Sequence, residues 1–201
     1  MTASPRRDGH PLPTLLLAAV LCGTAFAQAA ADDKSSAAAA PAPPEVSPRG
    51  QRTANDIRYG EWQKLCFRPG GAQTVCRTSI TGRYETGQMA VRADLIERDG
   101  EPTTRLQVFV PVGMYLQIPA KLTVDGGQSY RLPYSWCLTN ACIAADVAAP
   151  GLLKDMETGK SMVLEIVDSN LLALTTSFPL AQFATAHKGP PARTLEQDVD
   201  E

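Results

Sequence analysis

Residues 89–127 of this 201-residue chain read MAVRADLIERDGEPTTRLQVFVPVGMYLQIPAKLTVDGG, and this stretch decides the fold class. Apolar side chains alternate with charged or polar ones, a period of two that is typical of a β-strand with one buried face. The alternation predicts strands over residues 89–95, 106–110, 112–118 and 122–124. Asp125-Gly126-Gly127 predicts a tight turn after the last of them.

Strand patterns continue on both sides of this stretch. Two apolar runs, residues 162–168 and 171–178, are separated by Ser169-Asn170, which predicts a hairpin. Weaker strand patterns cover residues 59–66, 74–81 and 129–134, and short helices are predicted only at 151–158 and 180–188. About nine short strands with frequent turns favour an all-β fold, mainly an antiparallel β-sandwich or open barrel, with one or two short helices.

The N-terminus has the features of an export signal. Arg6 and Arg7 precede an apolar stretch, and Ala25-Phe26-Ala27 has the small–x–small pattern behind which signal peptidase cuts. We therefore predict a signal peptide over residues 1–27. Two alternatives stay open. Cys22 could carry a lipid, although Leu21 is larger than the residue that such a site prefers. Residues 12–31, about twenty without a charge, could form an uncleaved membrane anchor.

Composition divides the remaining chain into three parts. Residues 28–55 are rich in alanine and proline and predict a disordered linker, because they can bury too little apolar surface to offset the entropy of ordering. Residues 56–187 predict the folded β domain. Residues 188–201 contain prolines and an acidic end, and predict a disordered tail.

The cysteine count agrees with export. Four of the five cysteines remain once Cys22 leaves with the signal peptide, and an even number in an exported chain predicts disulfides. Cys66, Cys76, Cys137 and Cys142 allow three connectivities. Each close pair brackets a predicted turn, so we predict Cys66–Cys76 and Cys137–Cys142. A four-cysteine zinc site is the alternative, although the wide spacing of the first pair does not match the usual C-x2–4-C pattern.

The sequence excludes several classes of ligand and of catalytic site. A net charge of −2 gives no basic footprint for nucleic acid, and the motifs of zinc proteases, P-loops and dinucleotide sites are missing. His10 belongs to the predicted signal peptide, and His187 is predicted to be exposed where the domain gives way to the tail. A catalytic histidine needs rigid neighbours. We therefore predict no catalytic residue, no cofactor and no metal site.

A pair of catalytic carboxylates is harder to exclude, because sequence spacing does not constrain it. The candidates are Asp94, Glu97, Asp99 and Glu101. They are interleaved with Arg92, Arg98 and Arg105, a pattern that predicts solvated strand faces with cross-strand charge pairs. Hydrolysis of an envelope polymer by an acid pair stays an alternative.

Binding is the role that the residues favour. The candidate surface consists of aromatic side chains, which offer large contact area for little conformational entropy: Phe109, Tyr115, Tyr130, Tyr134 and Trp136. The alternative is that both faces of an inner sheet are buried and these side chains belong to the core.

A series of short motifs points to a known family. Trp62-x3-Cys66 and Cys76 come first, and Pro111-x-Gly113-x-x-Leu116 and Asp125-Gly126 follow. Cys137-x4-Cys142-x-Ala144 then precedes a Leu-Leu helix and a hydrophobic hairpin. In this order the motifs resemble the invasion-associated locus B (IalB) family of exported bacterial proteins, over about residues 58–186.

The resemblance implies a compact β-sandwich-like protein of the bacterial envelope, with no established enzymatic activity. It implies a periplasmic, secreted or cell-surface location and a link to virulence. We expect binding to an unknown envelope or host protein, no nucleic-acid partner, and no membrane insertion after signal cleavage. A periplasmic assembly or stress factor is a further alternative.

Overall fold

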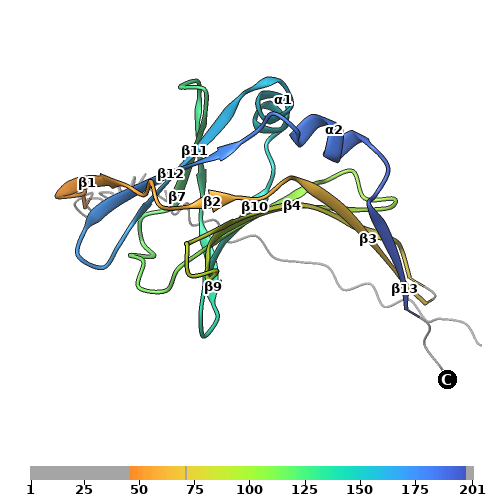
Figure 1. Cartoon of the computed structure of the whole chain (residues 1–201), viewed down its shortest axis with the longest axis horizontal. Helices are drawn as coiled ribbons and strands as arrows, with labels where there is room; N and C mark the ends of the chain where they lie inside the picture. The colour runs from red at the N-terminus through yellow and green to blue at the C-terminus, as the bar shows by residue number, and fades with distance from the viewer. Residues whose placement is uncertain (1–45, 71, 198–201) are drawn as a thin grey trace, which may run out of the picture. The chain divides into compact units, whose positions relative to one another are not determined.

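A computed structural model describes residues 46–70 and 72–197 of the chain (Figure 1). The strands are β1 (Gly50–Thr53), β2 (Arg58–Tyr59), β3 (Gln63–Pro69), β4 (Val75–Arg83), β5 (Met89–Arg98), β6 (Arg105–Val110), β7 (Ala120–Val124), β8 (Ser129–Leu132), β9 (Tyr134–Cys137), β10 (Cys142–Val147), β11 (Ser161–Val167), β12 (Leu172–Pro179) and β13 (Arg193–Gln197). The helices are α1 (Pro150–Thr158) and α2 (Phe183–Lys188). The predicted all-β fold with one or two short helices is confirmed, and the helices are two.

The strands form two sheets. The five-stranded sheet has the order β1-β12-β11-β7-β8. The eight-stranded sheet has the order β13-β3-β4-β5-β6-β10-β9, and β2 pairs with β4 beside this path. Neighbouring strands are antiparallel except at one edge of each sheet, where β1 runs parallel to β12 and β13 runs parallel to β3.

One hydrophobic core lies between the sheets. The alternation read from the sequence places Leu95 and Leu106 of the larger sheet in contact with this core, together with Leu122 and Leu164 of the smaller one. All four side chains are fully buried, and removal of such apolar surface from water is the main stabilising term. Figure 1 shows α1 and α2 side by side on one side of β3, where α2 adds Phe183 to the core.

Two predicted turns are confirmed, and each depends on an aspartate. Between β11 and β12, Asp168 Oδ1 accepts hydrogen bonds from the backbone N–H groups of Asn170 and Leu172, at 2.9 Å each. Between β7 and β8, Asp125 has a φ of 47° and is followed by Gly126 at 73°, the left-handed region that a tight hairpin turn requires.

The strand predicted at residues 112–118 is wrong. The segment is a loop that makes one isolated bridge, Met114 to Asp168. Gly113 has a φ of 87°, and the Ile118 N–H turns back to the Tyr115 carbonyl at 3.3 Å. Proline at both ends of this segment removes two donors from any ladder, so local turn geometry prevails over the two-residue period.

Both predicted disordered ends contain a strand. β1 lies within the predicted linker and β13 within the predicted tail, so residues 50–53 and 193–197 correct those boundaries. Each adds in parallel to an edge strand, and backbone hydrogen bonds to a preformed sheet require no apolar pattern in the added strand. Residues 1–45, which include the predicted signal peptide, lie outside the described residues.

Both predicted disulfides are confirmed. Cys66–Cys76 joins β3 to β4, and Cys137–Cys142 closes the hairpin between β9 and β10. Over residues 46–70 and 72–197, neither helix combines the length and the apolar character that a bilayer span needs.

Candidate functional site

The side of the eight-stranded sheet that faces away from the core, here called the outer face, carries the candidate site. Strand pairing aligns Arg92, Phe109, Ile143 and Trp136 in one row across β5, β6, β10 and β9. The neighbouring rows add Asp94-Gln107-Ala145 and Ile96-Arg105-Val147. Residues from four strands therefore meet on one surface, although they are up to 55 positions apart in the chain.

A hollow of about 380 Å³ opens on this face, and we call it the Trp136 groove. Its lining includes Arg98, Glu101, Arg105, Gln107, Trp136 and Val147. Trp136 is 44% exposed and Val147 is 54% exposed, so the groove presents apolar surface to solvent beside guanidinium groups. An exposed aromatic ring in a concave, partly polar setting is typical of a binding site.

Arg105 gives the groove its positive character. Arg98 is paired with Glu101 at 3.5 Å, whereas no carboxylate of the described residues lies within ion-pair distance of Arg105. A guanidinium group carries five donors in a fixed fork that matches an anionic oxygen pair. Arg105 is therefore free to receive an anion.

A buried charge pair supports the middle of the outer face. Asp94 is 1% exposed and accepts a hydrogen bond from Arg92 at 2.7 Å. The Arg92 guanidinium lies 3.9 Å from the centre of the Phe109 ring, in cation–π contact. Asp94 is therefore not on a solvated face, which corrects the prediction; its arginine partner also lies on the same strand and not across the sheet.

Burial raises the pKa of the Asp94 carboxyl, and the charges of Arg92 and Arg77 only partly offset this effect. An acid whose folded pKa is raised contributes stability that is fully present below its unfolded pKa, near 3.8, and is lost as the pH rises through the folded pKa. At neutral pH the ionised Asp94 therefore costs stability. Its compensation is a fixed position for the Arg92 side chain.

Replacement of Asp94 with asparagine should leave the melting temperature at pH 7 unchanged or higher, because burial makes the folded chain favour the neutral carboxyl, which asparagine resembles in shape and charge. At pH 3, where the native carboxyl is neutral, the difference between variant and parent should shrink. Thermal denaturation at both pH values measures this. A variant that melts well below the parent at pH 7 would show that Asp94 is a net stabilising ion-pair partner.

The structure separates the five aromatic residues predicted to form one binding surface. Tyr130 and Tyr134 pack against the core, as the alternative interpretation held. Burial raises the pKa of Tyr134, and the Tyr130 hydroxyl donates to Asp155 at 3.1 Å. Tyr115 lies on the loop after β6, where its hydroxyl donates to Gln117. Phe109 and Trp136 alone share the outer face.

A larger hollow, about 720 Å³, lies beside β2 and β4. The two arginines that line it already have partners in the chain: Arg58 pairs with Glu85 at 2.9 Å, and Arg83 donates to the Gly87 carbonyl at 2.9 Å. It thus offers hydrogen-bonding groups but no guanidinium that lacks a partner. The Trp136 groove is the stronger candidate.

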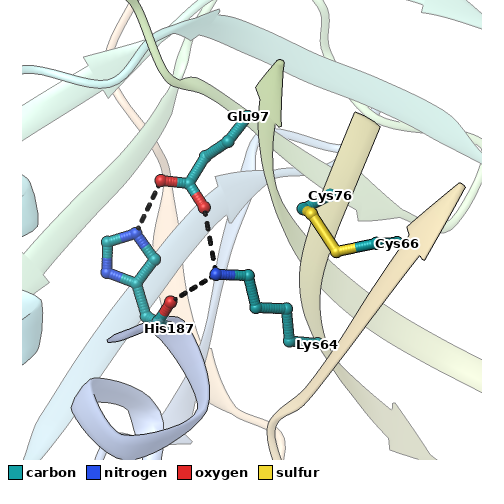
Figure 2. Close-up of a disulfide and its surroundings, with 5 residues drawn as sticks. All are labelled: Lys64, Cys66, Cys76, Glu97 and His187. Atoms are coloured by element: carbon teal, nitrogen blue, oxygen red, sulfur yellow. Dashed lines mark hydrogen bonds and ion pairs between the residues drawn. A yellow bond between two sulfur atoms is a disulfide. The ribbon is translucent and has the colours of Figure 1, made fainter. Parts of the chain in front are cut away.

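A second cluster surrounds His187, the single histidine of residues 46–70 and 72–197 (Figure 2). Its Nε2 lies 3.1 Å from Glu97 and its Nδ1 lies 3.2 Å from Glu157. Lys64 donates to the His187 carbonyl at 2.8 Å and lies 3.9 Å from Glu97. Lys188 pairs with Glu157 at 2.6 Å. The His187 side chain is only 11% exposed, so the prediction of an exposed histidine is wrong.

α2 explains the difference, because it fixes His187 against the sheet. The imidazole stacks on Phe183 of the same helix at 5.3 Å. Glu97 stands in register with Cys76, so the Cys66–Cys76 disulfide lies beside the cluster, as Figure 2 shows. Every charge here faces an opposite charge of the chain, and the described residues hold no group of three His, Cys, Asp or Glu side chains suited to a metal ion. The cluster is a structural tie between β3, β5 and the two helices.

The contribution of this cluster to the free energy of unfolding should depend on pH. The hydrogen bond from Lys188 lowers the pKa of Glu157 below its usual value of 4.5, and the charges of Lys188 and His187 add to this against the effect of burial. An acid with a lowered folded pKa contributes stability that is present above its unfolded pKa and is lost as the pH falls through the folded pKa.

Unfolding free energy should therefore decline as the pH falls below 4.5, and Glu157→Gln should reduce that slope. Urea denaturation over a pH series measures it. Glu85→Gln is the matched control, because the Arg58–Glu85 pair is largely exposed and such pairs contribute little. Equal slopes for the parent and Glu157→Gln would contradict the prediction.

Comparison with known proteins decides the family. The family described as invasion associated locus B (IalB) protein matches residues 62–191, which is more than half of the chain. The chain belongs to the IalB family. The matched range holds all of both helices and both disulfides, and every residue of the Trp136 groove and of the His187 cluster. The resemblance read from the sequence motifs is confirmed.

A solved IalB structure has a similar fold. The crystal structure of invasion associated protein B from Bartonella henselae superposes with a TM-score of 0.57 at 20% sequence identity. The match covers 65% of this chain and 90% of that one. A search of curated proteins gave no match. At this identity the IalB neighbour supports the fold, and the site must be argued from the residues of this chain.

The sequence predicts Trp136 as a candidate binding residue but does not predict its neighbours. It places Arg105 only in a solvated charge pattern, and nothing local distinguishes Gln107 or Val147. Arg105 and Gln107 alternate with the apolar residues of β6, but their position beside Val147 depends on the register between β6 and β10.

Proposed function

We propose that this IalB-family protein is exported to the bacterial envelope and acts there by binding, without catalysis, through the outer face of its eight-stranded sheet. One observation carries the proposal: a half-exposed tryptophan stands in a groove beside Arg105, which has no carboxylate partner among the described residues. Large aromatic side chains and arginine are the residues that most often dominate binding energy.

The arrangement of the acidic residues supports binding over hydrolysis. Strand alternation puts Asp94 and Glu97 on opposite faces of β5, so they cannot act on one bond. Glu97 and Glu157 approach each other only through the ring of His187, which occupies an oxygen of each. A polymer hydrolase needs two carboxylates open to its substrate.

Export is proposed from the N-terminal sequence, with a signal peptide over residues 1–27 and a periplasmic, secreted or cell-surface protein as its product. The two disulfides support an oxidising compartment. Protease digestion of intact and osmotically opened cells tests the location. Protection in both would contradict export, whereas cleavage on intact cells would favour a host-facing partner over an envelope component.

Binding is tested by sedimentation of the purified chain with isolated cell envelopes. Trp136→Ala should move most of the protein to the supernatant, because the exposed ring is lost from the groove. Val163→Ala is the matched control, since Val163 is an exposed apolar residue (37%) on β11 of the other sheet. If Trp136→Ala sediments as fully as Val163→Ala, the outer face is not the binding surface.

A further inference from the structure

We propose that the Trp136 groove binds an anionic polysaccharide, a polymer of sugars that carry carboxylate, sulfate or phosphate groups. This inference rests on the proposed function and names the class of ligand. Three properties of the groove support it: its charge, its exposed aromatic ring and its place on the sheet.

The charge of the outer face is opposite to that of the whole chain. Four arginines lie on it or line the groove, namely Arg77, Arg92, Arg98 and Arg105, against the two carboxylates of Asp94 and Glu101. The chain as a whole has a net charge of −2. Arg92 is paired with Asp94 and Arg98 with Glu101, whereas Arg77 and Arg105 have no ion-pair partner among the described residues. A local surplus of positive charge on an acidic protein favours a polyanion at this face.

The backbone that carries Trp136 is held in place before any ligand arrives. Trp136 pairs with Ile143, which is 2% exposed, and the next residue is held by the Cys137–Cys142 disulfide. A tryptophan side chain has only two rotatable bonds, so it loses little entropy on binding. The flat face of an indole packs well on the apolar face of a sugar ring, while Gln107 and Arg105 beside it can bond hydroxyl and anionic groups.

The place of the groove on the sheet disfavours an acidic peptide. Its lining comes from the faces of β5, β6 and β10 and from the β5–β6 turn, in addition to edge strand β9. A peptide that adds as a strand would pair with β9 in the plane of the sheet and leave the groove empty. A ligand that fills the groove must be recognised by side chains alone, which suits a polymer whose functional groups project from rings.

Fluorescence offers a direct test on the purified chain. The protein has two tryptophans, and Trp62 is only 5% exposed, so a change in emission on titration reports on Trp136. The probes are polygalacturonate and dextran sulfate as anionic polysaccharides, neutral dextran, and poly-L-glutamate as an acidic peptide. We expect saturable binding of at least one anionic polysaccharide, weakened by salt, and no binding of dextran.

The variants are read by calorimetry, which does not depend on the indole. Trp136→Ala and Arg105→Ala should each weaken binding about tenfold or more. Trp136→Phe and Arg105→Lys should restore part of it, because each keeps the ring or the charge. Arg131→Ala is the control, since Arg131 is an exposed arginine on β8 of the other sheet. Melting curves verify that each variant is folded.

Three results would overturn the inference: no binding of either anionic polysaccharide, binding that survives both alanine variants, or tighter binding of poly-L-glutamate. The sedimentation test separates this failure from that of the proposed function. If Trp136→Ala abolishes envelope binding and no anionic polysaccharide binds, the surface is right and the ligand class is wrong. If neither test responds to Trp136→Ala, both proposals fail.

Discussion

Replacement of Phe183 with alanine should lower the free energy of unfolding by about 3–5 kcal/mol, the usual cost of removing a large aromatic side chain from a core. Phe183 is fully buried, and its ring packs edge-on against Trp62 at a centroid distance of 4.8 Å. Trp62 is itself fixed by a 2.7 Å hydrogen bond from its Nε1 to the Pro179 carbonyl. The cavity would therefore have walls that cannot easily collapse.

The loss should be concentrated at α2. This helix has six residues, too few to be stable without tertiary contacts. Phe183 is its one buried side chain, and His187 stacks on the Phe183 ring. Without that ring, His187 should lose its position between Glu97 and Glu157.

Urea denaturation measures the global effect, and hydrogen exchange of the Ala186 amide, which bonds to the Gln182 carbonyl, measures the local one. Phe67→Ala is the control, because Phe67 is only half-buried and lies on the outer face. Phe183→Leu extends the series if the alanine variant does not fold, and it should destabilise less. A cost no larger than that of Phe67→Ala would mean that α2 is not anchored by Phe183.

Where the sequence alternates strongly, it predicts the fold well. β5 and β6 follow the apolar pattern within a few residues, because every second side chain enters the core and the others face outward. The hairpin between β11 and β12 is equally predictable, since a polar pair between two apolar runs leaves few other conformations.

The missed strands have a common physical cause. In β10, Cys142, Ile143, Ala144 and Ala145 are all buried, so both faces of the strand are apolar and no alternation marks it. β1 and β13 depend on distant partners, β12 and β3, that supply the hydrogen bonds. Neither property can be read from a local window of sequence.

The site was less predictable than the fold. A tryptophan next to a disulfide cysteine is visible in the sequence, but its neighbours in the groove depend on the register of β5, β6, β10 and β9. The burial of Asp94 depends on the same register, together with the way Arg92 folds back onto Phe109. His187 is predicted to be exposed because it adjoins the predicted disordered tail. Its environment is instead set by Glu97 and Glu157, which come from elsewhere in the chain.

Removal of the Cys66–Cys76 disulfide by a double alanine substitution should lower the free energy of unfolding by about 3 kcal/mol, and removal of Cys137–Cys142 by about 2 kcal/mol. The disulfides close loops of sequence separation 10 and 5, and the entropy that a cross-link removes from the unfolded chain grows with loop length. Urea denaturation of the parent and the two double variants measures both values.

The two disulfides should also differ in which neighbouring site they support. Cys66–Cys76 fixes β3, which carries Lys64 of the His187 cluster, so its loss should loosen that cluster as well as the fold. Cys137–Cys142 holds the edge hairpin that presents Trp136, so its loss should weaken binding at the groove more than its smaller cost in stability would suggest. Each double variant is then the control for the other. A larger loss of stability on removal of Cys137–Cys142 would contradict the argument from loop length. A larger loss of binding on removal of Cys66–Cys76 would mean that the β3–β4 pair, and not its own hairpin, holds the groove in place.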